Sequence, residues 1–207
     1  NILSIDNSSV AGVILNDGIT VNDSLKMLNG ILDLNGSDIT ISGVYTRTNG
    51  FFAGHTTSDM IINGAGTLAE IHFSTPQELN SFTMNRNSEV SILGTKLAVT
   101  DTQVSDGTIQ MNAGKYHDVN NALTNLVGSS GLLLRSDAFG TASLIQSTGQ
   151  VEATVERYMS GGYWHYMFSP LSAVNKTVIT GGINPNLYRY DETQVDYWNT
   201  TTVYGTS

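Results

Sequence analysis

The chain has 207 residues, enough for one large all-β domain or two smaller ones. Its 18 Asp and Glu residues outnumber its 9 Lys and Arg residues, which argues against nucleic acid as a partner because phosphate binding needs a basic surface. Without cysteine the chain forms neither disulfides nor thiolate metal sites, and no apolar run approaches the roughly 20 residues of a membrane-spanning helix, so we expect no membrane insertion.

From residue 13 to residue 43, short apolar runs alternate with turn residues rich in Asn, Asp and Gly. The in-out-in alternation of a strand occurs at 19–21, 25–27, 32–34 and 39–41. Asn29-Gly30 interrupts the one segment that is apolar enough for a helix, and Asn35-Gly36 marks a further turn. The sequence therefore predicts strands and tight turns in place of helices.

Two architectures fit this pattern: a meander of hairpins in a sandwich or barrel, and a parallel solenoid. Strands of three or four residues are short for hairpins, and their even spacing favours the solenoid. A loose internal repeat, 15–36 against 93–114, aligns Ile19 with Leu97 and Val21 with Val99, and such copying is typical of solenoids. We predict an all-β fold with a right-handed parallel β-helix of about seven coils over residues 1–157.

The composition changes after Gln150, where aromatic residues become frequent. Residues 151–158 alternate as one long strand, and the tail reads as strand, turn and strand around Gly181-Gly182. We predict that 158–207 form the start of an antiparallel β-sandwich that is incomplete. Because the sequence begins with Asn1 and carries no signal peptide, we expect a trimmed piece of a longer exported protein.

A junction segment, GQVEATVERYMSGGYWHYMFSPLSAV (149–174), follows blocks such as LKMLNGILDLNG (25–36) and LAVTDTQVSDGTIQMNAG (97–114). In these motifs and their order the chain resembles large secreted surface proteins of the Bacteroidetes, in which β-helical repeats precede a "VERY…WHY…SP" junction. The resemblance implies a β-helix followed by a β-sandwich, an extracellular or cell-surface location, and adhesive or coat-forming roles. It also implies export by the type nine secretion route, although this chain lacks the sorting domain of such proteins. It supplies no catalytic residues.

The titratable residues show no catalytic or metal-binding spacing. Histidine occurs at His55, His72, His117 and His165. None of them forms an HxH or HExxH pattern, and the alternation around His72 predicts that its side chain points outward. Glu152 and Glu156 share one face of the predicted strand, as a glycosidase pair could, but a solvated edge is the simpler expectation. We therefore expect no enzymatic activity, no metal and no cofactor.

The sequence favours a non-enzymatic extracellular structural or adhesive protein that acts as a stiff β-solenoid. Two alternatives stay open. In one, the chain is the subunit of an extracellular filament, with other copies of itself as partners through open strand edges. In the other, it is a carbohydrate-binding or carbohydrate-active module, with Trp164 and Trp198 stacking on a surface polysaccharide. Asp23-Ser24-Leu25 resembles the O-glycosylation acceptor of that phylum, which makes Ser24 a candidate glycosylation site.

Overall fold

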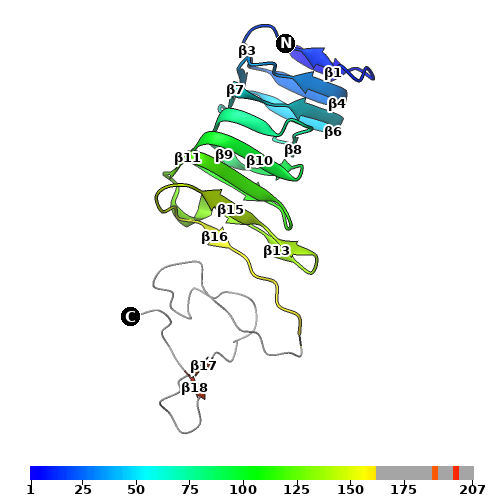
Figure 1. Cartoon of the computed structure of the whole chain (residues 1–207). Coiled ribbons are helices and arrows are strands. Elements are labelled where there is room, and N and C mark those ends of the chain that lie inside the picture. Colours follow the sequence, from blue (N-terminus) through cyan, green and yellow to red (C-terminus); the bar gives the residue numbers. More distant parts are fainter. Residues whose placement is uncertain (162–187, 191–197, 201–207) are drawn as a thin grey trace. The chain divides into compact units, whose positions relative to one another are not determined.

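The computed structural model describes residues 1–161, 188–190 and 198–200. The chain divides into two units, Asn1–Ser160 and Gly161–Ser207, and each is described by itself. In the first unit, parallel strands stack coil upon coil from the N-terminal β1 to β16 (Figure 1). This unit is a β-solenoid of about seven turns, which confirms the predicted fold class.

Most strands of the solenoid run parallel to their neighbours. Those of the earlier coils are β1 (Ile2–Asp6), β2 (Val13–Ile14), β3 (Ile19–Val21), β4 (Ser24–Asp33), β5 (Ile39–Ile41), β6 (Val44–Ala53), β7 (His55–Ile62) and β8 (Ile71–His72). Those of the later coils are β9 (Glu78–Leu93), β10 (Lys96–Met111), β11 (Tyr116–Asn125), β12 (Leu132–Leu134), β15 (Ser143–Gln146) and β16 (Thr154–Val155).

Three smaller elements complete the described structure. A single turn of 3-10 helix, η1 (Gly128–Ser130), precedes β12, and β13 (Ser136–Asp137) pairs antiparallel with β14 (Gly140–Thr141). In the second unit β17 (Tyr188–Tyr190) pairs antiparallel with β18 (Trp198–Thr200). The rest of the predicted sandwich, including the turn at Gly181-Gly182, lies outside the described residues.

Equivalent residues of successive coils lie one above another in columns. One column runs from β3 through β5, β7 and β9 to β10 and contains Ile19, Ile39, Met60, Phe82 and Thr102. Parallel pairing in register places each side chain directly on its counterpart in the next coil, so apolar residues stack on apolar residues. The interior is therefore one continuous core along the coils.

The register differs from the one that the internal repeat implied. Ile19 belongs to the column that passes through Thr102 to Leu123, whereas Leu97 pairs with His117 in a separate column. The alignment of Ile19 with Leu97 was therefore wrong as a guide to structural position. The alignment failed because two stretches of alternating apolar and polar residues can be aligned at many offsets. In addition, corners of different length change the number of residues in each coil.

Local turn chemistry shapes the corners. Asn35 and Gly36 adopt φ of 49° and 85°, which confirms a turn at this pair. At Asn29-Gly30 the chain also turns, with φ of 83° at Gly30, but β4 continues through the corner. The predicted strands 25–27 and 32–34 consequently join in one strand, apart from Leu34.

The predicted strand over 151–158 is wrong, because only Thr154–Val155 form a strand, β16. β16 pairs with β12, which itself has only three residues. A strand forms only where a neighbour offers backbone partners, and the short β12 limits β16 in this way.

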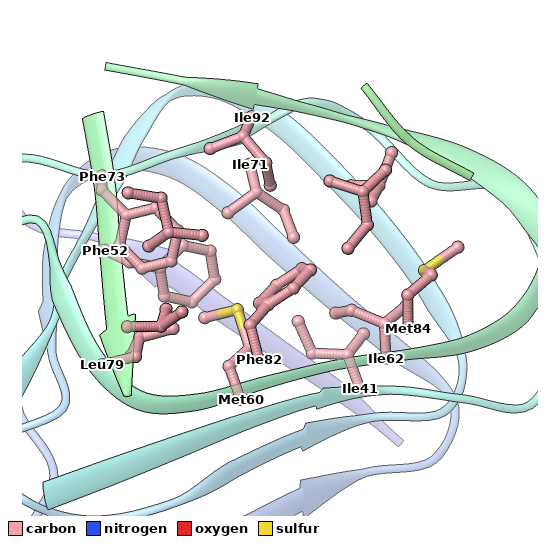
Figure 2. Packing of buried hydrophobic residues seen from close by; sticks show 14 of the residues in the cluster. Ile41, Phe52, Met60, Ile62, Ile71, Phe73, Leu79, Phe82, Met84 and Ile92 are labelled. Atoms are coloured by element: carbon pink, nitrogen blue, oxygen red, sulfur yellow. The ribbon is translucent and has the colours of Figure 1, made fainter. Parts of the chain in front are cut away.

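The core consists of aliphatic, methionine and aromatic side chains that point inward from every side of the coils. Figure 2 shows Phe52, Phe73 and Phe82 among Ile, Leu and Met side chains in the interior. Phe52 and Phe73 occupy one column, with ring centroids 6.0 Å apart. Tilted aromatic pairs at this distance add to the stability that burial provides.

Candidate functional site

An open groove of about 540 Å³ on the described surface is a candidate site. Several successive coils contribute to it, because each coil places its corner beside that of the next. The groove is lined by Asn7, Ser8, Ser9, Asn29, Gly30, Ile31, Phe51, His72, Phe73, Ser74, Thr75 and Gln77.

One wall of the groove is the loop after β1, which side-chain hydrogen bonds of Asn7 hold in place. The Asn7 Oδ1 accepts a bond from the backbone N–H of Ser9 at 2.8 Å, and its Nδ2 donates to the carbonyl of Gly12 at 3.0 Å. The Asn7 backbone N–H donates to the carbonyl of Asn29 at 3.2 Å. These bonds form an Asx turn and attach the loop to the next coil.

Gly30 allows this close approach between the two coils. A Cβ atom at Gly30 would overlap the carbonyl oxygen of Asn7, and its φ of 83° also favours glycine. The residue type at position 30 therefore determines how near the loop lies to β4.

Arg47, Phe51 and His72 form a compact cluster at the groove. The guanidinium of Arg47 lies 5.6 Å from the centroid of the Phe51 ring, and its NH2 group lies 3.0 Å from Nδ1 of His72. The Phe51 and His72 rings meet edge to face at 4.6 Å. Arg47 Nε also donates to the carbonyl of Gly50 at 2.8 Å. The contacts of Arg47 with Phe51, His72 and Gly50 thus fix the orientation of the guanidinium.

The contact with Arg47 determines the protonation state of His72. A guanidinium only donates hydrogen bonds, so Nδ1 of His72 must accept, and the ring proton of the neutral imidazole lies on Nε2. Partial burial, followed by the positive charges of Arg47 and Lys115, lowers the pKa of His72 below its ordinary value of 6.5. His72 is therefore neutral at pH 7 and carries an N–H donor on Nε2.

The groove is polar but carries almost no charge. Seven of its twelve lining residues are Ser, Thr, Asn or Gln, and none is Asp, Glu, Lys or Arg. Arg47 contacts two of the lining residues from the edge and forms no salt bridge within the described part of the chain. The groove thus combines neutral hydrogen-bonding groups with one unneutralised cation.

A second, smaller groove of about 260 Å³ runs across β9, β10 and β11 near Asp101. The Asp101 Oδ1 accepts bonds from Asn121 Nδ2 at 2.8 Å and from the Ala122 N–H at 3.1 Å. Two coils earlier, Asp59 accepts bonds from Asn80 and Ser81 in the same manner. These carboxylates join neighbouring corners, and within the described residues no group of His, Cys, Asp and Glu could hold a metal ion.

Two buried polar side chains, Arg86 and His117, lie inside the solenoid. No sequence pattern predicted that they would be buried. The guanidinium of Arg86 donates to the carbonyls of Asn63, Ile41 and Gly43 at 2.7, 3.1 and 2.8 Å. His117 is fully buried and bonded to Thr102. Both satisfy their hydrogen-bonding groups internally, so they stabilise the fold and are not exposed to a ligand.

The sequence-based candidates do not coincide with the groove. Trp164 lies outside the described residues, as does His165, and for Trp198 only the backbone of β18 is described, where it pairs with Tyr190. Ser24 is the half-buried first residue of β4 and pairs with Ile2 and Val44. Its glycosylation stays a prediction.

Glu152 and Glu156, the candidate carboxylate pair of the sequence, make different kinds of contact. Glu156 forms an ion pair with Arg135 at 2.5 Å, while the backbone carbonyl of Glu152 accepts a bond from Asn125. Among the histidines, His72 points outward as expected and lines the groove, whereas His117 is internal. Sequence reasoning missed Arg47 and Phe51, and the outward alternation at His72 was the one signal that led toward this surface.

No protein-family model, curated protein or solved structure matches the chain. Among the described residues there is no helix of the length and hydrophobicity that crossing a membrane requires.

Proposed function

We propose that the protein is an extracellular structural or adhesive component that acts at the cell surface as a stiff spacer and has no enzymatic activity. The observation that carries this proposal is the unbroken parallel ladder from β3 through β5, β7, β9 and β10 to β11. Backbone hydrogen bonds join every coil to the next, so bending the stack would strain several ladders at once. The sequence resemblance to secreted surface proteins supports the proposed location.

The chemistry of the grooves supports a non-enzymatic role. His72 is the one titratable side chain that lines the larger groove, and acid–base catalysis usually needs at least two groups with separate roles. In the smaller groove Asp101 is occupied by hydrogen bonds to the neighbouring corner. Neither arrangement resembles a prepared nucleophile or proton-transfer pair.

The location is tested by labelling producing cells with an antibody against the solenoid, before and after permeabilisation. We expect intact cells to be labelled and externally added protease to remove the label. Labelling that needs permeabilisation would contradict the proposed location.

Stiffness is tested separately by electron microscopy of the purified full chain. Straight particles of constant length are expected, and collapsed or irregular particles would oppose a spacer role.

A second candidate function is a filament subunit, and the first coil favours it. Within the described residues β1, β2 and β3 each pair with a strand on one side only. Ile2 and Val10 near this edge are 64% and 94% exposed. An open edge with apolar neighbours can pair with another chain. Fibres with a regular axial repeat would support this candidate, and a monomer at every concentration in sedimentation would rule it out.

A further inference from the structure

We propose that the groove beside β6 and β8 binds a sugar that bears a carboxylate, such as a residue of a polyuronate chain. In this assignment Arg47 binds the carboxylate, and the side chains of Ser8, Asn29 and Thr75 in the lining bind the sugar hydroxyls. The inference goes beyond the proposed function, which names no ligand, and it does not depend on the cellular location of the protein.

The first argument is the hydrogen-bonding capacity of Arg47. A guanidinium has five N–H donors. Within the described residues, Nε is used by the Gly50 carbonyl and one donor of NH2 by His72. The remaining donors have no partner there, while the Gly50, Phe51 and His72 contacts fix the plane of the group. A fixed fork with free donors suits the two oxygens of a carboxylate.

The second argument is local charge. The chain carries a formal net charge of −9, so most of its surface repels an anion. The groove differs, because its lining contains no carboxylate and Arg47 lies at its edge. Lys115 and Glu70 both act electrostatically on His72, with opposite sign. The groove therefore places a cation beside a lining that holds no carboxylate to repel an anionic ligand.

The third argument is the character of the lining. Asn7, Ser74 and Gln77 already use side-chain groups in bonds to the protein. The side chains of Ser8, Asn29 and Thr75, which form no hydrogen bond within the described residues, and the Nε2–H of His72 offer donors and acceptors without charge, as a polyhydroxylated ligand needs. Phe51 and Ile31 add apolar surface for the C–H groups of a sugar. The volume of about 540 Å³ falls within the roughly 300–1,000 Å³ typical of small-ligand sites.

The experiment is isothermal titration calorimetry of the full chain with hexagalacturonate at pH 7 and roughly 0.15 M salt, where nonspecific charge attraction is screened. Maltohexaose, an uncharged hexasaccharide, and citrate, a carboxylate without a sugar ring, are titrated in parallel. We expect hexagalacturonate to bind and both comparison ligands to bind at least about tenfold more weakly. Maltohexaose lacks the carboxylate that Arg47 would bind, and citrate lacks the sugar hydroxyls that the lining would bind.

Matched variants locate the binding. Arg47→Gln removes the charge at the groove, and Arg157→Gln makes the same change at an exposed position elsewhere. We expect Arg47→Gln to weaken hexagalacturonate binding about tenfold or more, Arg157→Gln to change it by less than about twofold, and Arg47→Lys to fall between them. Thermal unfolding of each variant shows whether the fold is retained.

Asn29→Asp supplies a test that leaves Arg47 in place, since Asn29 is exposed and lines the groove. A carboxylate at this position should repel the ligand and weaken binding about threefold or more, within the range of a single surface charge. Absence of hexagalacturonate binding, equal affinity for maltohexaose, equal affinity for citrate, or equal losses in Arg47→Gln and Arg157→Gln would each overturn the proposal.

Discussion

Nε2 of His117 lies 2.9 Å from Oγ1 of Thr102, and both side chains are buried within the solenoid. Nδ1 of His117 lies 3.1 Å from the carbonyl oxygen of Leu97, which can only accept a hydrogen bond. Nδ1 therefore carries the proton, Nε2 accepts from the Thr102 hydroxyl, and the imidazole is neutral. Burial lowers the pKa of His117 from 6.5 to about 4, although the Leu97 carbonyl and Asp118 act in the opposite direction.

This pair predicts a loss of stability in mild acid. Because the folded-state pKa of His117 lies below the unfolded value, the unfolded chain binds more protons as the pH falls from 6.5 to about 4. Above pH 6.5 His117 is neutral in both the folded and the unfolded chain, so its protonation costs no stability. By pH 4.5 the free energy of unfolding should be lower by about 2.5 kcal/mol through this group. Urea unfolding at pH 7 and pH 4.5 measures the loss.

The double variant His117→Leu with Thr102→Val is the control, because it removes both polar partners together. Its free energy of unfolding at pH 7 should lie within about 1.5 kcal/mol of the parent protein, since neither partner is left unsatisfied. Between pH 7 and pH 4.5 it should lose less stability than the parent. Identical losses in the two proteins would show that His117 is not the group responsible.

Arg86 predicts a large structural effect at one position. Its buried guanidinium donates to carbonyl oxygens of Ile41, Gly43 and Asn63, which belong to two earlier coils. Arg86→Ala would remove these hydrogen bonds and create a cavity, so the free energy of unfolding should fall by about 3 kcal/mol or more. Arg157→Ala, at an exposed position, should change it by less than about 0.5 kcal/mol. Comparable values for both variants would refute a structural role for Arg86.

Alanine substitutions at two glycines with similar φ angles distinguish the cost of a steric clash from the cost of backbone strain. Gly107 and Gly114 have φ of 78° and 74°. A Cβ at Gly107 would overlap the carbonyl oxygens of Arg86 and Ser88, whereas a Cβ at Gly114 would meet nothing within 4 Å. Gly114→Ala should cost about 1 kcal/mol through its left-handed conformation, and Gly107→Ala clearly more. Chemical denaturation of both variants checks the order, which an equal cost would contradict.

Ser58 and Ser81 predict opposite effects of the same substitution. The hydroxyl of Ser58 is buried and has no hydrogen-bond partner within the described structure, while that of Ser81 donates to Asp59 at 2.7 Å. Ser58→Ala should leave the free energy of unfolding unchanged or raise it by about 1 kcal/mol, because a buried unpaired hydroxyl is unfavourable. Ser81→Ala should lower it by about 1 kcal/mol. Thermal melts of the two variants should move in different directions, and a destabilised Ser58→Ala would count against this account.

Local features of the fold could be predicted from the sequence because they depend on neighbouring residues. The positive φ values of Asn35 and Gly36 follow from residue types that tolerate this conformation. The alternation at 19–21 and 39–41 likewise corresponds to β3 and β5, which pair directly. The register over longer distances could not be predicted, since the residue count of each coil depends on how its corners pack.

The same limit applies to the groove. Arg47 and His72 are separated by 25 residues, and they meet because β6 and β8 lie on the same side of the solenoid. No residue pattern links position 47 to position 72, whereas coils of a constant length would have revealed the pair. The outward direction of His72 was predictable from alternation alone, but its partner depended on the three-dimensional register.

The in-register columns also have a consequence for how the molecule acquires its structure. A finished coil presents a row of free N–H and C=O groups and an apolar layer on its face, which is the surface that the next segment of chain needs in order to order itself. Most pairings join segments only about one coil apart in sequence, so folding can start anywhere along the stack and advance from coil to coil as growth does on a crystal face. The slow step of folding is then the formation of whichever coil forms first, because that coil has no neighbour on which to order itself.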